Sequence, residues 1–203
     1  MAHHLSQQQI NEYVTAHNNA RSTVNPRAAT PLQHLAWSDD LATQAGQWAS
    51  QCTFGHSGRP GVGENIYITT NPSSAPINLN PQQPVQSWDD EKQYYDYNNN
   101  TCEPGKMCGH YTQIVWEDSQ NVGCAVQNCP VLKNNPFTQQ YPGYTLAVCQ
   151  YTPPGNMNNE RPYAAGNSTV AHTPASTLTP TRHPEATITP AQRHHQFGEW
   201  PRN

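Results

Sequence analysis

The sequence predicts a mixed fold of the α+β or layered α/β/α type, stabilised by disulfide bonds. Three segments repeat apolar residues at helical spacing, and three others have the apolar alternation of strands. The helices precede and interleave with the strands, which is typical of a domain in which helices cover a sheet. All six cysteines lie between positions 52 and 149, and such an even set indicates a disulfide framework formed in an oxidising compartment.

Each predicted helix has a start signal followed by a stripe of mostly apolar side chains. Ser6 with Gln9 forms a capping box. Ser38 precedes two acidic residues, and Pro84 suits the first turn of a helix. The three stripes are Ile10, Tyr13, Val14 and His17, then Leu41, Ala45, Trp48 and Cys52, then Val85, Trp88, Glu91 and Tyr95. The predicted strands span 66–70, 122–126 and 144–151.

The composition excludes several classes of protein. The 203 residues carry a formal charge of −4 and no basic stripe, which argues against nucleic acid as a partner. No apolar run approaches the roughly 20 residues of a transmembrane helix. Aliphatic residues are few, and five Trp, ten Tyr and six Cys supplement the core. We therefore expect a monomeric globular domain without a transmembrane segment.

The chain divides into three parts of unlike composition. Residues 1–5 form an N-terminal extension, 6–159 hold every cysteine, and 160–203 are rich in Pro and Thr. The last part has too little apolar surface to offset its ordering entropy, so we expect a disordered tail. The first residues lack the apolar core of a signal peptide. Because the cysteines indicate secretion, we expect that a leader was removed or replaced.

Four ionisable residues are candidates for a functional site. Glu91 falls on the stripe of the third helix, where a carboxylate needs a partner because burying an unpaired charge is costly. Glu64 lies in a glycine-containing segment that lets backbone approach closely. His56 and His110 each follow a glycine in a polar context. The four could form one cluster, but their spacing equally allows four separate surface residues.

Four motifs in the chain resemble those of the CAP superfamily, which unites cysteine-rich secretory proteins, antigen 5 and pathogenesis-related class 1 proteins. The segment 109–116 with Ser119 resembles the first long signature, and 148–157 resembles the second. Two shorter motifs, at 17–21 and 63–66, also occur in the family order. The resemblance spans residues 6–159, an SCP-like extracellular domain, and its closest type is pathogenesis-related class 1.

The resemblance implies a three-layer α/β/α sandwich with a central antiparallel sheet. It also implies that His56, Glu64, Glu91 and His110 converge in a large cleft. The disulfide pairs that it implies are Cys52–Cys124, Cys102–Cys108 and Cys129–Cys149. We expect His17, Asn18 and Arg21 to bond neighbouring backbone rather than to line the cleft, since buried polar groups need partners.

The sequence leaves three functional hypotheses open. The first is a secreted, non-enzymatic binding module for a lipid, a sterol or a partner protein, whose cleft can hold a divalent cation. The metal ligands would be His56 and His110, and Zn²⁺ is the expected but not obligatory cofactor. The second is a metal-dependent hydrolase or peptidase in which Glu64 or Glu91 is the base, although an H-E-x-x-H helix is absent. The third is a defence-related protein that acts through its surface and tail.

Two sequons for N-linked glycosylation also occur, at 99–101 and 167–169. They bear on the protein only if it is made in a eukaryote.

Overall fold

The computed structural model describes residues 5–73 and 75–166. Its elements, in chain order, are α1 (Gln7–Ser22), β1 (Ala36–Trp37), α2 (Asp39–Ala49), β2 (Gly63–Asn71), α3 (Gln82–Asp89), the 3₁₀ helix η1 (Asp90–Tyr94), β3 (Tyr95–Asp96), β4 (Thr101–Cys102), α4 (Gly109–Ile114), β5 (Asn121–Cys129) and β6 (Gly143–Thr152). Within this part of the chain no helix has the length and apolar character needed to cross a membrane.

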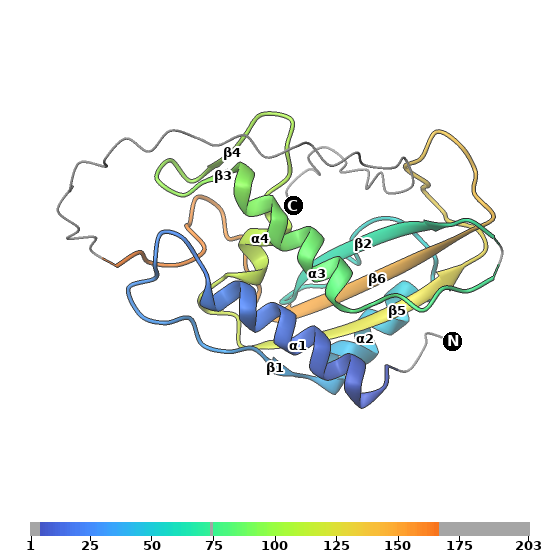
Figure 1. The fold of residues 1–203 in the computed structure, drawn as a ribbon, viewed down its shortest axis with the longest axis horizontal. Coiled ribbons are helices and arrows are strands. Elements are labelled where there is room, and N and C mark those ends of the chain that lie inside the picture. Colours follow the sequence, from blue (N-terminus) through green and yellow to red (C-terminus); the bar gives the residue numbers. More distant parts are fainter. Residues whose placement is uncertain (1–4, 74, 167–203) are drawn as a thin grey trace, which may run out of the picture.

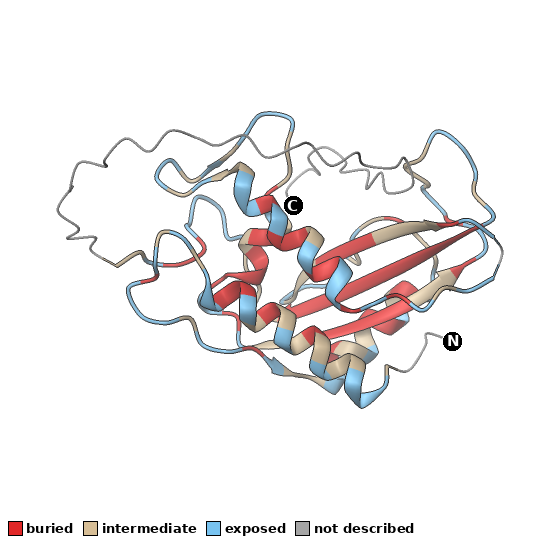
Figure 2. Cartoon of the chain, in the orientation of Figure 1, coloured by how far each residue is buried: buried red, intermediate tan, exposed pale blue. Residues whose placement is uncertain are grey.

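A four-stranded sheet lies between two layers of helices, as predicted. The strand order is β1-β5-β6-β2, with antiparallel pairing except between β1 and β5. Figure 1 shows α1, α3 and α4 on one face of the sheet and α2 on the other. Figure 2 shows that the middle of this sandwich is buried, above all β6. The fold is therefore a three-layer α/β/α sandwich.

The predicted helix starts are confirmed, whereas the third helix ends earlier than expected. The Ser6 and Gln9 side chains form the reciprocal capping box, and the Ser38 hydroxyl accepts from the amide of Leu41. The third helix stops at Asp89 and continues as the tighter η1. This change places Glu91 in a 3₁₀ turn beside α4. The helix α4 was not predicted, because its six residues are too few to show a helical stripe in the sequence.

Two of the three expected disulfides are wrong. Cys102–Cys108 is confirmed, but the other pairs are Cys52–Cys129 and Cys124–Cys149 instead of Cys52–Cys124 and Cys129–Cys149. The physical reason is strand geometry, because successive side chains point to opposite faces of a sheet. Cys129 lies five positions after Cys124 in β5, an odd number, so their side chains lie on opposite faces.

Each cysteine of β5 therefore has its own partner within reach. Cys124 lies directly opposite Cys149 in the β5–β6 register, on the face covered by α1. Cys129 packs in the cluster under α2, and Cys52 packs against the same cluster. A backbone hydrogen bond of 2.8 Å from Lys133 to Cys52 keeps the two segments together. A Cys129–Cys149 bond would have to cross the sheet.

The packed chain continues beyond the boundary expected at 159, up to the last described residue. Tyr163 is only 1% exposed, and its hydroxyl donates to the carbonyl of Pro26 at 3.0 Å. The carbonyl of Tyr163 accepts from the Tyr97 hydroxyl at 2.6 Å. The amide of Ala29 donates to the carbonyl of Ala164 at 2.8 Å. Residues 160–166 thus belong to the domain, and the rest of the expected tail lies outside the described residues.

Truncation of the chain tests this boundary. A chain ending at 159 should lose about 3–5 kcal/mol in the free energy of unfolding, because it lacks the buried aromatic ring of Tyr163. A chain ending at 166 keeps every contact described above and should unfold like the full chain. Urea denaturation measures both, with Tyr163→Ala as the matched point variant. Equal stability of the two truncated chains would contradict the extended boundary.

Candidate functional site

The carboxylate of Glu91 anchors both His110 and the first turn of α4. Its Oε1 lies 2.6 Å from Nδ1 of His110, and its Oε2 accepts from the amides of His110 and Tyr111 at 3.0 and 3.1 Å. The first amides of a helix have no partner within the helix, so a carboxylate there satisfies them. Glu91 is 3% exposed and is fully engaged by these donors. The sequence argument that this carboxylate needs a partner is confirmed.

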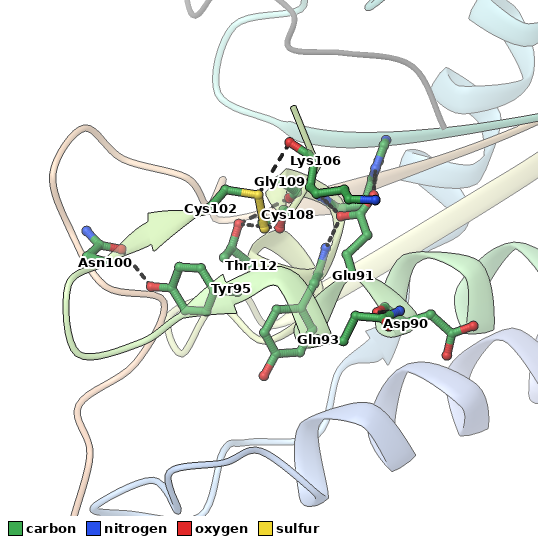
Figure 3. Close-up of a disulfide and its surroundings, with 12 residues drawn as sticks. Asp90, Glu91, Gln93, Tyr95, Asn100, Cys102, Lys106, Cys108, Gly109 and Thr112 are labelled. Carbon is green, nitrogen blue, oxygen red and sulfur yellow. Dashed lines mark hydrogen bonds and ion pairs between the residues drawn. A yellow bond between two sulfur atoms is a disulfide. The ribbon is translucent and has the colours of Figure 1, made fainter. Parts of the chain in front are cut away.

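Several further contacts fix the ring and backbone of His110. Its imidazole stacks on Trp88, with ring centroids 6.0 Å apart and planes 18° apart. The Cys102–Cys108 disulfide lies immediately before α4, and Figure 3 shows it beside Gly109 and Thr112. Because a carboxylate accepts, Nδ1 of His110 carries the proton, and Nε2 is the nitrogen that points away from Glu91.

The second pair, His56 and Glu64, lies where β2 begins. Glu64 Oε1 is 3.0 Å from Nδ1 of His56 and accepts from the Ser57 amide at 2.8 Å. Glu64 Oε2 accepts from the Gln150 side chain at 2.8 Å. Burial acts to raise the pKa of Glu64, but the hydrogen bonds from His56, Gln150 and Ser57 outweigh it and lower the pKa. This carboxylate is therefore held in its charged form.

The two pairs approach β2 from different elements, and Asn65 links them. Glu64 turns toward His56 and Gln150, whereas the next residue, Asn65, donates to the carbonyl of His110 at 3.0 Å. The four predicted site residues thus form two His–Glu pairs joined through the start of β2. Among the described residues, no group of three or more His, Cys, Asp or Glu side chains is placed to hold a metal ion.

A buried chain of hydrogen bonds continues from Asn65 into the first helix. The Asn65 side chain also donates to the Tyr151 hydroxyl at 3.2 Å, and that hydroxyl lies 2.8 Å from Nε2 of His17. Nδ1 of His17 is 2.8 Å from the carbonyl of Tyr13. A carbonyl only accepts, so His17 carries its proton on Nδ1 and accepts from Tyr151 through Nε2.

The polar residues of α1 are structural, as expected. Arg21 is 1% exposed and donates to the carbonyls of Ile114 and Trp116 at 2.9 and 2.7 Å, at the end of α4. Burial lowers the pKa of Arg21 to about 10, so it remains charged at neutral pH. Asn18 exchanges two hydrogen bonds with the backbone of Leu35. These residues hold the elements around the site without lining it.

Gln150 is the site residue that the sequence reasoning missed. It lies directly opposite Glu64 in the β2–β6 register and is 1% exposed. Its signal was a polar residue within the apolar alternation of 144–151. Gln113 packs against Gly63, the first residue of β2, and Gly155, in the loop after β6. Its side-chain oxygen accepts from the amide of Gly155 at 3.0 Å, and a Cβ at Gly63 would collide with it.

A separate cavity of about 430 Å³ lies between the start of α1 and the segment before α3. It is lined by Ser6, Gln8, Gln9, Glu12, Asn78, Leu79, Asn80, Pro81 and Gln82. None of the four predicted site residues borders it, and most of its lining is polar.

Comparison with known proteins agrees with this architecture. The sequence model of the "Cysteine-rich secretory protein family" matches residues 14–151. The chain belongs to the CAP family. A "Pathogenesis-related protein PR-1 type" of Sambucus nigra is 38% identical over 163 residues, which cover 78% of this chain and 84% of that protein. "Peptidase inhibitor 16" of Homo sapiens is 37% identical over 155 residues.

The match to human peptidase inhibitor 16 covers 75% of this chain but 31% of that protein, so this CAP chain spans about a third of such relatives. Among solved structures, the "Crystal structure of NaASP2 with Zn2+" superposes with a TM-score of 0.61 at 26% identity. That comparison covers 80% of this chain and 88% of the other. CAP proteins such as the PR-1 and peptidase inhibitor 16 relatives are secreted, consistent with three disulfides in this domain.

The stability of the domain should fall between pH 6.5 and 4 because of His17. Burial lowers the pKa of His17 from 6.5 to about 4, which outweighs the opposing bond to the Tyr13 carbonyl. In this window the unfolded chain binds a proton that the folded chain excludes, so stability is lost as the pH falls. The loss amounts to about 3 kcal/mol. Glu64, with its pKa lowered from 4.5, adds a further loss that begins as the pH falls past 4.5.

Urea denaturation at a series of pH values measures this dependence, and His17→Gln should flatten it between pH 6.5 and 4. A His17→Gln chain with the wild-type slope would contradict the assignment. If that variant does not fold, NMR titration of the wild-type ring replaces it. The His17 ring should then remain neutral at pH 5.5, and a protonated ring at that pH would count against the account.

Proposed function

We propose that this CAP domain is an extracellular binding module in which the two His–Glu pairs present imidazoles to a ligand. The observation that carries the proposal is the engagement of both carboxylates. Glu91 and Glu64 each accept three hydrogen bonds, of which one comes from an imidazole and at least one from a backbone amide. A carboxylate held in this way orients its histidine and is poorly placed to take a proton from a substrate. The arrangement favours binding over hydrolysis.

The ligand proposed for the imidazoles is a divalent cation, with Zn²⁺ as the first candidate. Zinc-binding histidines usually direct one ring nitrogen at the metal while the other bonds a carboxylate, and both pairs have this carboxylate–imidazole contact. The donor set therefore fits Zn²⁺ in kind. With His56 and His110 as its only protein ligands, the ion would be weakly held and completed by water. The related NaASP2 structure was solved with Zn²⁺, which supports the candidate.

The second ligand that we propose is a polar or protein partner rather than a sterol. The cavity beside α1 is lined mainly by amide side chains, among them Gln9, Asn78 and Gln82. Lipid and sterol pockets are predominantly apolar, so this lining suits a peptide or another hydrogen-bonding ligand. A defence-related role is compatible with this choice, since a relative bears the name pathogenesis-related protein.

Calorimetric titration with Zn²⁺ tests the metal proposal. Wild-type protein should bind the ion, and His110→Ala or His56→Ala should weaken binding by at least about tenfold, the lower end of the loss seen for altered outer-shell partners. His34→Ala is the matched control, because His34 is exposed on the loop before β1. Any Zn²⁺ binding by histidines outside the described residues contributes the same heat to the titration of every variant. Identical isotherms for the wild type and His110→Ala would remove the proposed site.

A further inference from the structure

The hairpin formed by β3 and β4 carries three successive asparagines at its turn. Figure 1 shows the hairpin extending from the end of α3 away from the four-stranded sheet. Only Asn99 is followed two positions later by a threonine, Thr101. Asn98 is followed at that distance by another asparagine, and Asn100 by Cys102, which is bonded to Cys108. The sequon N-x-T therefore selects one residue of the three.

Asn100 builds the turn, and the turn leaves Asn99 on its outer side. Asn100 has a φ of +53° in the left-handed region, which asparagine tolerates better than most residues. Its side chain accepts from the Tyr95 hydroxyl at 2.6 Å, as Figure 3 shows, and donates to the carbonyl of Glu160 at 3.1 Å. Asn100 thus joins the hairpin to the C-terminal segment of the domain.

Asn99 and Thr101 are both exposed. The amide nitrogen of the Asn99 side chain donates to Oδ2 of Asp96 at 2.6 Å. Asp96 is itself exposed, and its other oxygen accepts from the backbone amides of residues 98 and 99. The hydrogen bond between the Asn99 side chain and Asp96 therefore faces solvent. If it is lost, the hydrogen bonds from the backbone amides of residues 98 and 99 to Asp96 still hold the turn.

We propose that Asn99 is an N-glycosylation site, occupied when the chain passes through a eukaryotic secretory pathway. The co-reactant is a lipid-linked oligosaccharide diphosphate. The side-chain nitrogen of Asn99 bonds to the anomeric carbon of the first sugar, the bond from that carbon to the diphosphate oxygen breaks, and the lipid diphosphate leaves. The amide nitrogen loses one proton in the exchange, and no oxidation or reduction occurs.

The chain contains an internal contrast to this site. Asn71-Pro72-Ser73 also has an asparagine followed two positions later by a hydroxyl residue, but the proline between them excludes it from the sequon. Asn71 is also 2% exposed and accepts from the Thr145 hydroxyl at 2.9 Å in the interior. The sequon at Asn167 lies outside the described residues, so an experiment has to separate its contribution from that of Asn99.

The test is expression of the full chain, behind a secretion leader, in a eukaryotic host. With Asn167→Gln as the background, the secreted protein should lose one glycan on treatment with a peptide N-glycosidase, an amidase that converts the modified Asn to Asp. Peptide mass spectrometry should place the new Asp at position 99. Adding Asn99→Gln or Thr101→Ala should abolish the glycan, whereas Asn98→Gln and the conservative Thr101→Ser should retain it.

Secreted Asn167→Gln protein without a glycan on Asn99 would overturn the proposal, as would a glycan that persists in Thr101→Ala. If Asn99→Gln fails to be secreted, the comparison of Thr101→Ala with Thr101→Ser decides the question, since it leaves Asn99 and its turn unchanged. The presence of a glycan does not depend on metal binding. The glycosylation proposal and the zinc proposal can therefore be contradicted independently of each other.

Discussion

The carboxylate of Glu91 is the contact on which the arrangement of the site depends. It comes from a 3₁₀ turn at the end of α3, accepts from the amides of His110 and Tyr111 in the first turn of α4 and holds the imidazole of His110 through the same group. A buried charge is tolerated only when its hydrogen-bonding capacity is used. The backbone of α4 therefore both stabilises Glu91 and is positioned by it. The same bonds that satisfy the carboxylate also orient the histidine.

The start of β2 connects this contact with the rest of the domain. Adjacent residues of the strand serve the two pairs, since Glu64 holds His56 and Asn65 holds the carbonyl of His110. From Asn65 the hydrogen bonds run through Tyr151 in the central strand to His17 in α1. A polar chain at the middle of the sandwich thus joins helices to sheet. We expect it also to make the domain sensitive to acid, because burial lowers the pKa of His17 to about 4 and favours the neutral ring.

Local signals in the sequence were sufficient to predict the helices and strands of the three layers, but not the disulfides and side-chain contacts between distant segments. Caps at Ser6 and Ser38 and the alternation in β5 and β6 predict the elements correctly, because they depend on neighbouring residues. The misplaced charge of Glu91 also predicts that it must have a partner. The pairs that the family resemblance implied for Cys124 and Cys129 were wrong, because the pairing depends on strand register and on which sheet face each side chain occupies. The four site residues could be predicted from the sequence. Which histidine contacts which glutamate could not, because those contacts also depend on how distant segments are arranged.

The most direct test of this account is the stability of Glu91→Gln, measured by urea denaturation at neutral pH. The amide has one acceptor oxygen, so it cannot serve the His110 ring and both helix amides together. The account predicts a loss of about 3–5 kcal/mol, as for other buried pairs that lose one partner. Glu103→Gln, on the exposed loop after β4, should change stability by less than about 0.5 kcal/mol. Equal stabilities for the two variants would contradict the central role of Glu91.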